Sequence, residues 1–286
     1  MTEQFKMDAP ATAHRLDDMV QGLVGAPLDR PEGPLKVTGT ATYANEWQVE
    51  GMVHGVMVRA PGNSGRMVLA NRDAVAKMPG VLAVIQDERL LRNPAQGTAN
   101  KAPIQGPQHV AYLGQLIAVV VAEGFEQARH AAQSLQVHLE NGEVMPVDPA
   151  TAAVEPQEGK ALDQGDLESA MKDAAFSVDV TYTTPSHSSS PMEPHASIAS
   201  WEGDDLTLRG SYQMLKYNRN ELSDALGIHP DRLRILSPYV GGGFGSKLGI
   251  APEAVAAAIA AKEVGRPVSV ALQRPQVYEA TMRRSE

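Results

Sequence analysis

The stretch of this sequence with the clearest chemical potential is a glycine-rich loop at residues 241–247, which reads Gly-Gly-Gly-Phe-Gly-Ser-Lys. Glycine permits positive φ angles and lets the backbone approach a ligand closely, so successive glycines predict a surface of main-chain amides. Such amides suit an anion, for example a phosphate or a metal-oxo group. Phe244 is one of only four phenylalanines in the chain, and a loop that only had to turn would not need its large ring.

Two familiar nucleotide-binding loops do not match this stretch. The dinucleotide pattern G-x-G-x-x-G, counted from Gly241, requires glycine where Ser246 stands, and the P-loop pattern fails there too, with Leu248 after the lysine. Glycine loops without a ligand are common, so a tight turn with close helix packing explains the same residues. The spacing alone leaves two interpretations open, a binding surface and a structural turn.

A second group of ionisable residues lies on a loop rich in proline and serine at residues 184–195. Its members His187, Glu193 and His195 are residue types that ligate metals, but facial-triad spacing is usually tighter, which favours a structural or supporting role. Ser188 is not surrounded by a G-x-S-x-G elbow, which argues against a serine nucleophile. We therefore assign no metal ligand and no serine nucleophile to this loop.

The predicted elements place the glycine loop between a strand and a helix. Residues 232–236 alternate as in a strand, 251–264 are alanine-rich as in a buried helix, and 268–272 predict another strand. The order strand, loop, helix, strand is that of a βαβ unit. Gln213 lies at another predicted strand-to-helix junction, where its amide either faces a ligand or is solvated.

The whole chain predicts an α+β protein. Residues 1–33 are polar and contain proline, which predicts an extended N-terminal arm, and 34–145 mix strands and helices in a first compact domain. The proline-rich, acidic segment 146–166 resembles an interdomain linker. The second domain, 167–286, opens with a helix, followed at 176–183 by the clearest half-buried strand pattern in the sequence. Further strands are predicted at 36–43, 51–58, 81–85, 116–122, 198–201 and 206–212, and helices at 71–78 and 125–135.

The composition limits the classes of function. The net charge of -9 and the pI near 5.4 argue against nucleic-acid binding, because phosphate neutralisation needs clustered Lys and Arg. No apolar run approaches the roughly 20 residues that a membrane span requires. The sequence has no cysteine, which excludes disulfides, thiolate catalysis and cysteine-ligated iron–sulfur clusters within it. The first ten residues show no export signal, so we expect a cytoplasmic protein, or a periplasmic one if a partner carries it.

Three stretches in a fixed order resemble one enzyme family. They are Pro-Met-Glu-Pro-His-Ala at 191–196, Ser-Tyr-Gln at 211–213, and Ser-Pro-Tyr-Val followed by the glycine loop at 237–247. Together they are similar to the large, molybdenum-binding subunit of the xanthine oxidase family of molybdenum hydroxylases, above all its bacterial aldehyde oxidoreductase branch. Residues 37–44, 78–81 and 112–123 resemble the α/β hammerhead domain of that family.

The resemblance implies an α/β hammerhead-like domain followed by the first part of a mixed α/β molybdenum-cofactor-binding domain. It also implies molybdenum held by molybdopterin, which we expect in the cytosine dinucleotide form. The implied reaction oxidises an aldehyde or an aromatic heterocycle with water as the oxygen donor. Electrons would then pass to partner subunits that carry [2Fe-2S] clusters and FAD.

The resemblance also implies roles for particular residues. In the family, the residue matching Phe244 lies beside the metal, and its glycine loop, here Gly242, Gly243 and Gly245, packs around the cofactor. Gln213 belongs to the second matching stretch, and we count it with the cofactor-binding residues.

Two positions depart from the pattern of the family. His187 stands where a glutamine usually approaches the apical side of the metal, and imidazole can donate a similar hydrogen bond. Leu248 replaces the substrate-binding glutamate of the xanthine-type members, which favours an aldehyde or another apolar aromatic compound over a purine.

The catalytic base of the family lies near the far C-terminus of a subunit more than twice as long as this chain. We therefore expect a second polypeptide, or a missing segment, to complete the molybdenum subunit and to supply the base. Iron–sulfur and flavin subunits are the other expected partners. Two alternatives stay open: a non-catalytic partner or assembly module that keeps the fold without an active cofactor, and an unrelated α/β protein whose glycine loop binds phosphate.

Overall fold

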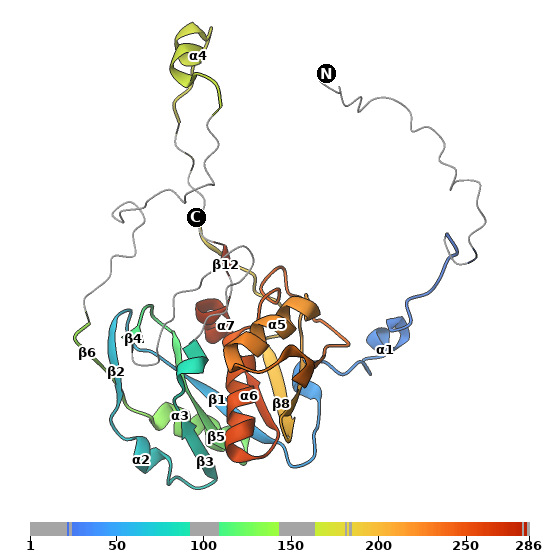
Figure 1. Cartoon of the computed structure of the whole chain (residues 1–286), viewed down its shortest axis with the longest axis vertical. Helices are drawn as coiled ribbons and strands as arrows, with labels where there is room; N and C mark the ends of the chain where they lie inside the picture. The colour runs from blue at the N-terminus through green and yellow to red at the C-terminus, as the bar shows by residue number, and fades with distance from the viewer. Residues whose placement is uncertain are drawn as a thin grey trace. The chain divides into compact units, whose positions relative to one another are not determined.

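The structure is a computed structural model (Figure 1) that describes residues 22, 25–91, 109–142, 164–180, 182, 185–281 and 283–284. The chain forms two compact units, Met1–Ala41 and Thr42–Glu286. Most of the predicted arm at 1–33 lies outside the described residues, which include only 22 and 25–33 of it. The strand predicted at 36–43 is wrong, because helix α1 (Gly33–Val37) occupies its start and no strand follows. Pro34 presets a helical φ in the first turn of α1.

A seven-stranded sheet organises the second unit, in the order β10-β9-β8-β11-β1-β5-β3. Strand β1 joins strands from distant parts of the sequence, because it pairs parallel with β11 on one side and antiparallel with β5 on the other. The sheet therefore includes strands from both predicted domains, whose boundaries stay a prediction. Its strands are β1 (Val53–Arg59), β3 (Val81–Ile85), β5 (Leu116–Ala122), β8 (Ala196–Glu202), β9 (Asp205–Gly210), β10 (Leu233–Leu236) and β11 (Val268–Ala271).

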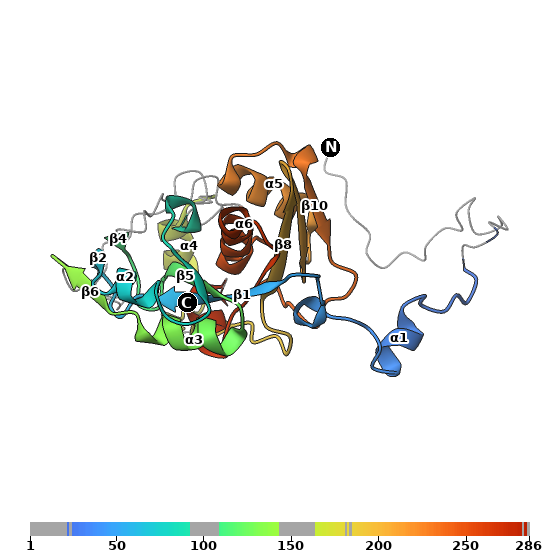
Figure 2. The same cartoon turned by 90° about the horizontal axis from the view of Figure 1, so that it is seen from below.

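Strand β5 shows why the sheet is covered on both faces. Its seven residues, Leu-Ile-Ala-Val-Val-Val-Ala, are all buried, with Val119 and Val121 in one hydrophobic core and Val120 and Ala122 in the other. Helix α3 (Phe125–Ser134) packs on the second core, and helix α6 (Pro252–Val264) on the first. Figure 2 shows these two helices on opposite faces of the sheet.

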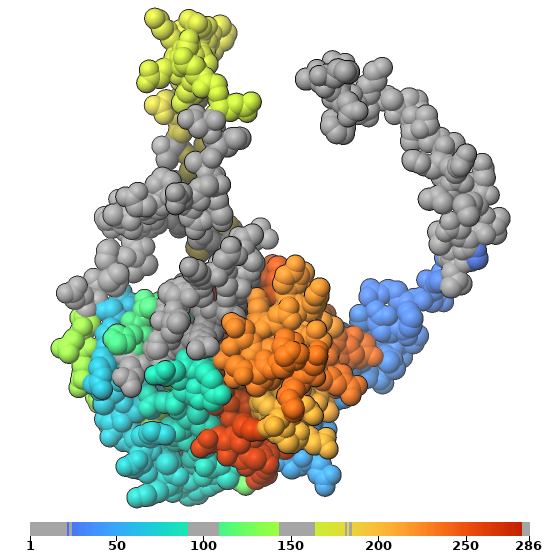
Figure 3. Space-filling view, in the orientation of Figure 1, coloured from blue at the N-terminus to red at the C-terminus, as the bar shows by residue number. Residues whose placement is uncertain are grey.

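Helix α6 follows the sequence prediction closely. Pro252 lies in its first turn, and Gly265 ends it with a left-handed φ of 65°. The alanines between them are buried, and such small side chains let the helix lie close to the sheet. Leu90, which precedes a gap in the described residues, belongs to the same hydrophobic core as α6. Figure 3 shows the teal surface of residues 81–91 directly beside the orange and red surface of the later elements.

No helix among the described residues has both the length and the hydropathy needed to cross a bilayer.

The remaining elements are short, apart from helix α5. Two small sheets have the orders β4-β2-β6 and β12-β7. The elements are β2 (Gly65–Leu69), β4 (His109–Val110), β6 (Val137–Glu140), β7 (His187–Ser188), β12 (Arg283–Arg284), α2 (Arg72–Val75), α4 (Leu167–Asp173), α5 (Leu215–Leu226), α7 (Arg274–Ala280), and 3-10 turns at Ala44–Glu46, Glu88–Leu91 and Pro230–Arg232.

Two expectations about strands need correction or refinement. The strand predicted at 176–183 is wrong for the residues that are described: 176–180 and Tyr182 form no strand, because no described strand pairs with them. The order strand, loop, helix, strand around the glycine loop is confirmed. However, β10 and β11 are not neighbours, because β9 and β8 lie between them.

We predict that Gly55→Ala destabilises the protein. Gly55 lies in β1, and a β-carbon there would lie 2.8 Å from Val270 Cγ2 and 3.1 Å from Val119 Cγ2, both on buried, branched side chains. Urea denaturation should show a loss of about 1–3 kcal/mol in the free energy of unfolding, the usual effect of overpacking a core.

The control for this substitution is Gly124→Ala, where the nearest atom to a new β-carbon is the flexible Gln127 Oε1 at 3.2 Å. It should change the free energy of unfolding by no more than about 0.5 kcal/mol. Equal effects of the two substitutions would contradict this account of the packing around β1.

Candidate functional site

The glycine loop has an unusual backbone between β10 and α6. Gly242 and Gly245 have φ angles of 98° and 95°, and Phe244 has a φ of 52°. Among the described residues, Phe244 and Asn141 are the only non-glycine residues with positive φ. This conformation is unfavourable for a bulky side chain, and the Phe244 ring is also 69% exposed. Such strain persists only where neighbouring residues hold the backbone in place.

Three successive amides at the centre of the loop are unpaired. The amides on either side have partners: Gly241 N donates to Glu193 Oε2 at 2.6 Å, and Gly245 N donates to Gln213 Oε1 at 3.1 Å. Between them, the amides of residues 242–244 donate to no acceptor in the described part of the chain. Consecutive free amides in a loop with positive φ angles form a concave donor surface that suits an anion or an oxo group.

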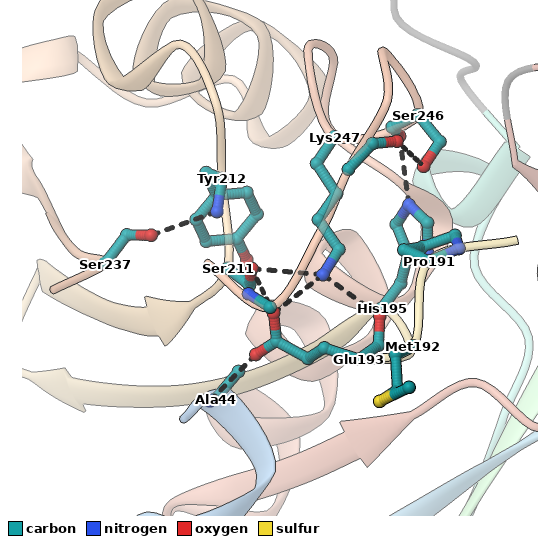
Figure 4. Close-up of polar contacts among 12 residues, drawn as sticks. Ala44, Pro191, Met192, Glu193, His195, Ser211, Tyr212, Ser237, Ser246 and Lys247 are labelled. Carbon is teal, nitrogen blue, oxygen red and sulfur yellow. Dashed lines mark hydrogen bonds and ion pairs between the residues drawn. The ribbon is translucent and has the colours of Figure 1, made fainter. Parts of the chain in front are cut away.

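A buried ion pair fixes the end of the loop (Figure 4). Lys247 is fully buried, and its Nζ lies 2.8 Å from Glu193 Oε2 and 3.1 Å from Ser211 Oγ. The Glu193 carboxylate also accepts hydrogen bonds from Ser211 Oγ at 2.6 Å and from Ala44 N at 3.2 Å. The pair thus joins the glycine loop to three other segments of the second unit.

The two members of this pair shift in pKa for opposing reasons. Burial alone would raise the pKa of Glu193, but hydrogen bonds from Lys247, Ser211 and the Gly241 amide outweigh it and hold that pKa below its ordinary value. Burial lowers the pKa of Lys247, and the contact with Glu193 opposes this shift. Each charge therefore stabilises the other across the 2.8 Å contact.

Gln213 and two of the glycines are explained by packing inside the loop. Gln213 Oε1 also accepts from Lys247 N at 3.2 Å, and a β-carbon on Gly243 would lie 2.4 Å from this oxygen. A β-carbon on Gly241 would lie 2.6 Å from Glu193 Cβ. The structural-turn interpretation thus accounts for these two glycines, but not for the unpaired amides. Binding of a cofactor by Gln213 stays a prediction.

His195 supports the loop in its neutral form. It is buried, and its Nε2 lies 2.9 Å from the Ser246 carbonyl oxygen, so Nε2 carries the donated proton. Burial lowers the pKa of His195 to about 4, which leaves the imidazole uncharged at neutral pH. Its Nδ1 has no partner among the described residues. His195 therefore anchors the loop that carries Glu193 to the glycine loop.

His187 is not brought to the glycine loop by any described side-chain contact. It is exposed in β7, where it pairs with Arg284 of β12. Two residues further on, Ser189 Oγ donates to the Phe244 carbonyl at 3.1 Å, so the two loops do meet. Among the described residues, no three His, Asp or Glu side chains come close enough to hold a metal. A role of His187 beside a cofactor stays a prediction.

Sequence reasoning missed the roles of Ser211 and Lys247 as partners of Glu193, and it missed a buried acid, Glu253, in the first turn of α6. Glu253 Oε1 accepts from Ser197 Oγ at 3.2 Å, Ser197 also bonds the Tyr212 hydroxyl, and Glu253 Oε2 has no described partner. Burial raises the pKa of Glu253 to about 7. The signal for these residues in the sequence is weak, because Glu253 and Lys247 are single charged residues next to apolar ones.

We predict that Lys247→Met and Glu193→Gln each lower the free energy of unfolding by about 3–5 kcal/mol, because each leaves its partner unpaired in the interior. Chemical denaturation should show that the double substitution costs less than the sum of the two. The exposed pair Arg66–Glu140 is the control, and Arg66→Met should cost less than about 1 kcal/mol. Strict additivity of the two buried substitutions would show that the side chains are not coupled.

We also predict a dependence of stability on pH from Glu253. Its pKa in the folded protein, about 7, lies above its ordinary value of 4.5, so the folded state keeps a proton that the unfolded chain releases. The resulting stabilisation is complete below about pH 4.5 and disappears as the pH rises through 7, a change of about 3 kcal/mol.

The variant Glu253→Gln should lack this decline, whereas Glu263→Gln, at an exposed position of the same helix, should keep it. Thermal denaturation of the three proteins between pH 4 and 8 makes the comparison. Parallel curves for all three would show that Glu253 does not hold the extra proton.

Comparison with known proteins agrees with the geometry. The family model described as molybdopterin cofactor-binding domain matches residues 156–286. The family model for the aldehyde oxidase and xanthine dehydrogenase a/b hammerhead domain matches residues 38–143. These matches confirm the predicted fold class.

Relatives with known names give the same result. The aldehyde oxidoreductase molybdenum-binding subunit PaoC of Escherichia coli (strain K12) is 42% identical over 285 residues, which are 98% of this chain and 38% of that protein. The nicotine 6-hydroxylase large subunit of Paenarthrobacter nicotinovorans is 29% identical, and the match covers 33% of that protein. This chain thus spans well under half the length of the relatives it matches.

Solved structures show the shared fold. Aldehyde oxidoreductase from Desulfovibrio gigas superimposes with a TM-score of 0.73 at 24% identity, covering 89% of this chain and 31% of that one. The chain belongs to the xanthine oxidase family of molybdenum hydroxylases, and it corresponds to part of the molybdenum-binding subunit.

Proposed function

We propose that this chain is part of a molybdenum-dependent hydroxylase that oxidises an aldehyde or an aromatic heterocycle with water as the oxygen donor. The observation that carries the proposal is the row of unpaired amides at residues 242–244 beside the exposed Phe244 ring. This row lies in the region that matches the molybdopterin cofactor-binding domain. The names of the relatives, an aldehyde oxidoreductase and a nicotine 6-hydroxylase, support the two substrate classes.

The residues of the loop fit such a cofactor. Molybdenum bound to molybdopterin, in our proposal the cytosine dinucleotide form, supplies the oxygen transfer and accepts electrons from the substrate. The amides of Gly242, Gly243 and Phe244 would donate hydrogen bonds to its oxygen atoms, and Gly245 would let the backbone pass close to it. The Phe244 ring would exclude water from the reacting face.

Two further side chains complete the proposed binding surface. The Gln213 side-chain oxygen accepts hydrogen bonds from the loop amides, so its Nε2 would be the group that donates to the cofactor. His187 would donate from the neighbouring loop, which meets Phe244 through Ser189. The ion pair of Glu193 and Lys247 would hold the amides in place without contacting the cofactor.

We assign the remaining parts of the reaction to polypeptide segments outside this chain. No residue of this chain is proposed as the catalytic base, which we place in the portion of the molybdenum subunit that this chain does not match. The sequence contains no cysteine, so [2Fe-2S] clusters would be carried by a partner subunit, and FAD by another. We also propose domains at 34–145 and 167–286 with a linker at 146–166, and a cytoplasmic location, or a periplasmic one with an exported partner.

The test is the metal content of the complex purified from its native source through a tag on this chain. We expect about one molybdenum and one pterin per copy of the chain, measured by elemental analysis and by fluorescence of the oxidised pterin. Absence of both from an intact complex would favour the alternative, a non-catalytic partner or assembly module.

A substitution in the loop sharpens this test. Gly243→Ala places a β-carbon 2.4 Å from Gln213 Oε1 and crowds the central amides, so we expect at least a roughly tenfold loss of molybdenum. Gly203→Ala, in the hairpin turn between β8 and β9, strains a φ of 60° but meets no atom within 4 Å, and it should keep its molybdenum. Similar metal contents in the two variants would contradict the assignment of the loop.

A further inference from the structure

The segment from α4 to Tyr182 exposes an unusual number of large apolar side chains. Phe176 is 94% exposed, Val178 75%, Val180 54% and Tyr182 88%. In α4, Leu167 and Met171 are also exposed, and no residue of this helix is buried. Contiguous apolar surface of this kind usually marks a site of interaction.

The spacing of these side chains identifies the kind of interaction. Apolar residues at 176, 178, 180 and 182 alternate with Ser, Asp and Thr, so an extended backbone places all four on one side. The described residues of 176–182 form no strand and pair with none of the described sheets. The segment therefore has the two requirements of strand addition, a free backbone and a one-sided apolar face.

The helix before it extends the same surface. Asp166 caps α4 by accepting from Ser169 N at 3.0 Å, so the helix is defined by its own sequence rather than by a tertiary contact. Leu167 and Met171 are four residues apart and lie on one side of the helix. A helix that is folded but unpacked, followed by a half-apolar extended segment, is a docking element without its partner.

The relatives indicate what the partner is. The segment lies inside the region that matches the molybdopterin cofactor-binding domain, and the PaoC subunit matches 98% of this chain with only 38% of its own length. A second copy of this chain fits less well, because an antiparallel pair centred on Asp179 would oppose two like charges.

We propose that residues 167–182 dock onto an open sheet edge in the portion of the molybdenum-binding subunit that this chain does not match, where 176–182 add as a strand. The apolar side chains of this strand and of α4 then cover an apolar face of that portion. The inference rests on the proposed function, because it takes the partner from the same subunit.

The test compares hydrogen exchange of the backbone amides in the 286-residue chain alone and in the holoenzyme. We expect the amides of 176–182 to exchange at unprotected rates in the chain alone and at least about 100-fold more slowly in the holoenzyme. Unprotected exchange in a holoenzyme that contains molybdenum would overturn the docking and leave the proposed function intact. Protection in an assembled complex without molybdenum would support the docking and contradict the proposed function.

Two matched substitutions test the side that docks. Val178→Lys changes the apolar side of the segment, and Asp179→Lys changes the opposite, polar side. We expect Val178→Lys to reduce the yield of assembled holoenzyme at least about tenfold, and Asp179→Lys to reduce it less than about twofold.

Neither substitution should change the thermal unfolding of the chain alone, because neither side chain lies in its core. Equal holoenzyme yields from the two variants would overturn the proposal. So would a dimer of the chain alone that Val178→Lys abolishes while the holoenzyme still assembles, because the occupant would then be a second copy.

Discussion

The conformation of the glycine loop depends on a lysine and a glutamate that share the protein interior. An unpaired charge at the position of Lys247 would be strongly destabilising, so the fold must bring Glu193 to it. The same carboxylate then takes the Gly241 amide and the Ser211 hydroxyl. The entry and the exit of the loop are thereby fixed, and the amides between them are left without a partner in the described part of the chain.

The surrounding fold supports this arrangement through small residues. The alanines of α6 let the helix that follows the loop lie close to the sheet, and β11, which follows α6, pairs with both β8 and β1. The loop that carries Glu193 and His195 leads directly into β8. Each part of the candidate site is therefore attached to one continuous sheet, which limits how far the two loops can move apart.

Much of this was accessible from sequence, and the failures have a common cause. The predictions for β5, α6 and the β8–β9 hairpin are confirmed, because buried runs, helix ends and turn residues are local signals. Residues 176–183 carry an equally clear local pattern but form no strand among the described residues. An alternating pattern is compatible with a strand, but a strand forms only where a neighbouring strand pairs with it. The pairing of Glu193 with Lys247 was missed because it joins distant parts of the chain without any periodic signal.

The pairing of β1 with β11 has a consequence for how the protein is made. Val53 and Val268 lie side by side in the sheet although more than 200 residues separate them in sequence. During translation, β1, β3 and β5 emerge first, and one edge of β1 stays unpaired until the residues between β1 and β11 have been synthesised. Such long-range pairing is slow and leaves apolar strands uncovered for that interval, which makes the nascent protein a natural client for chaperones.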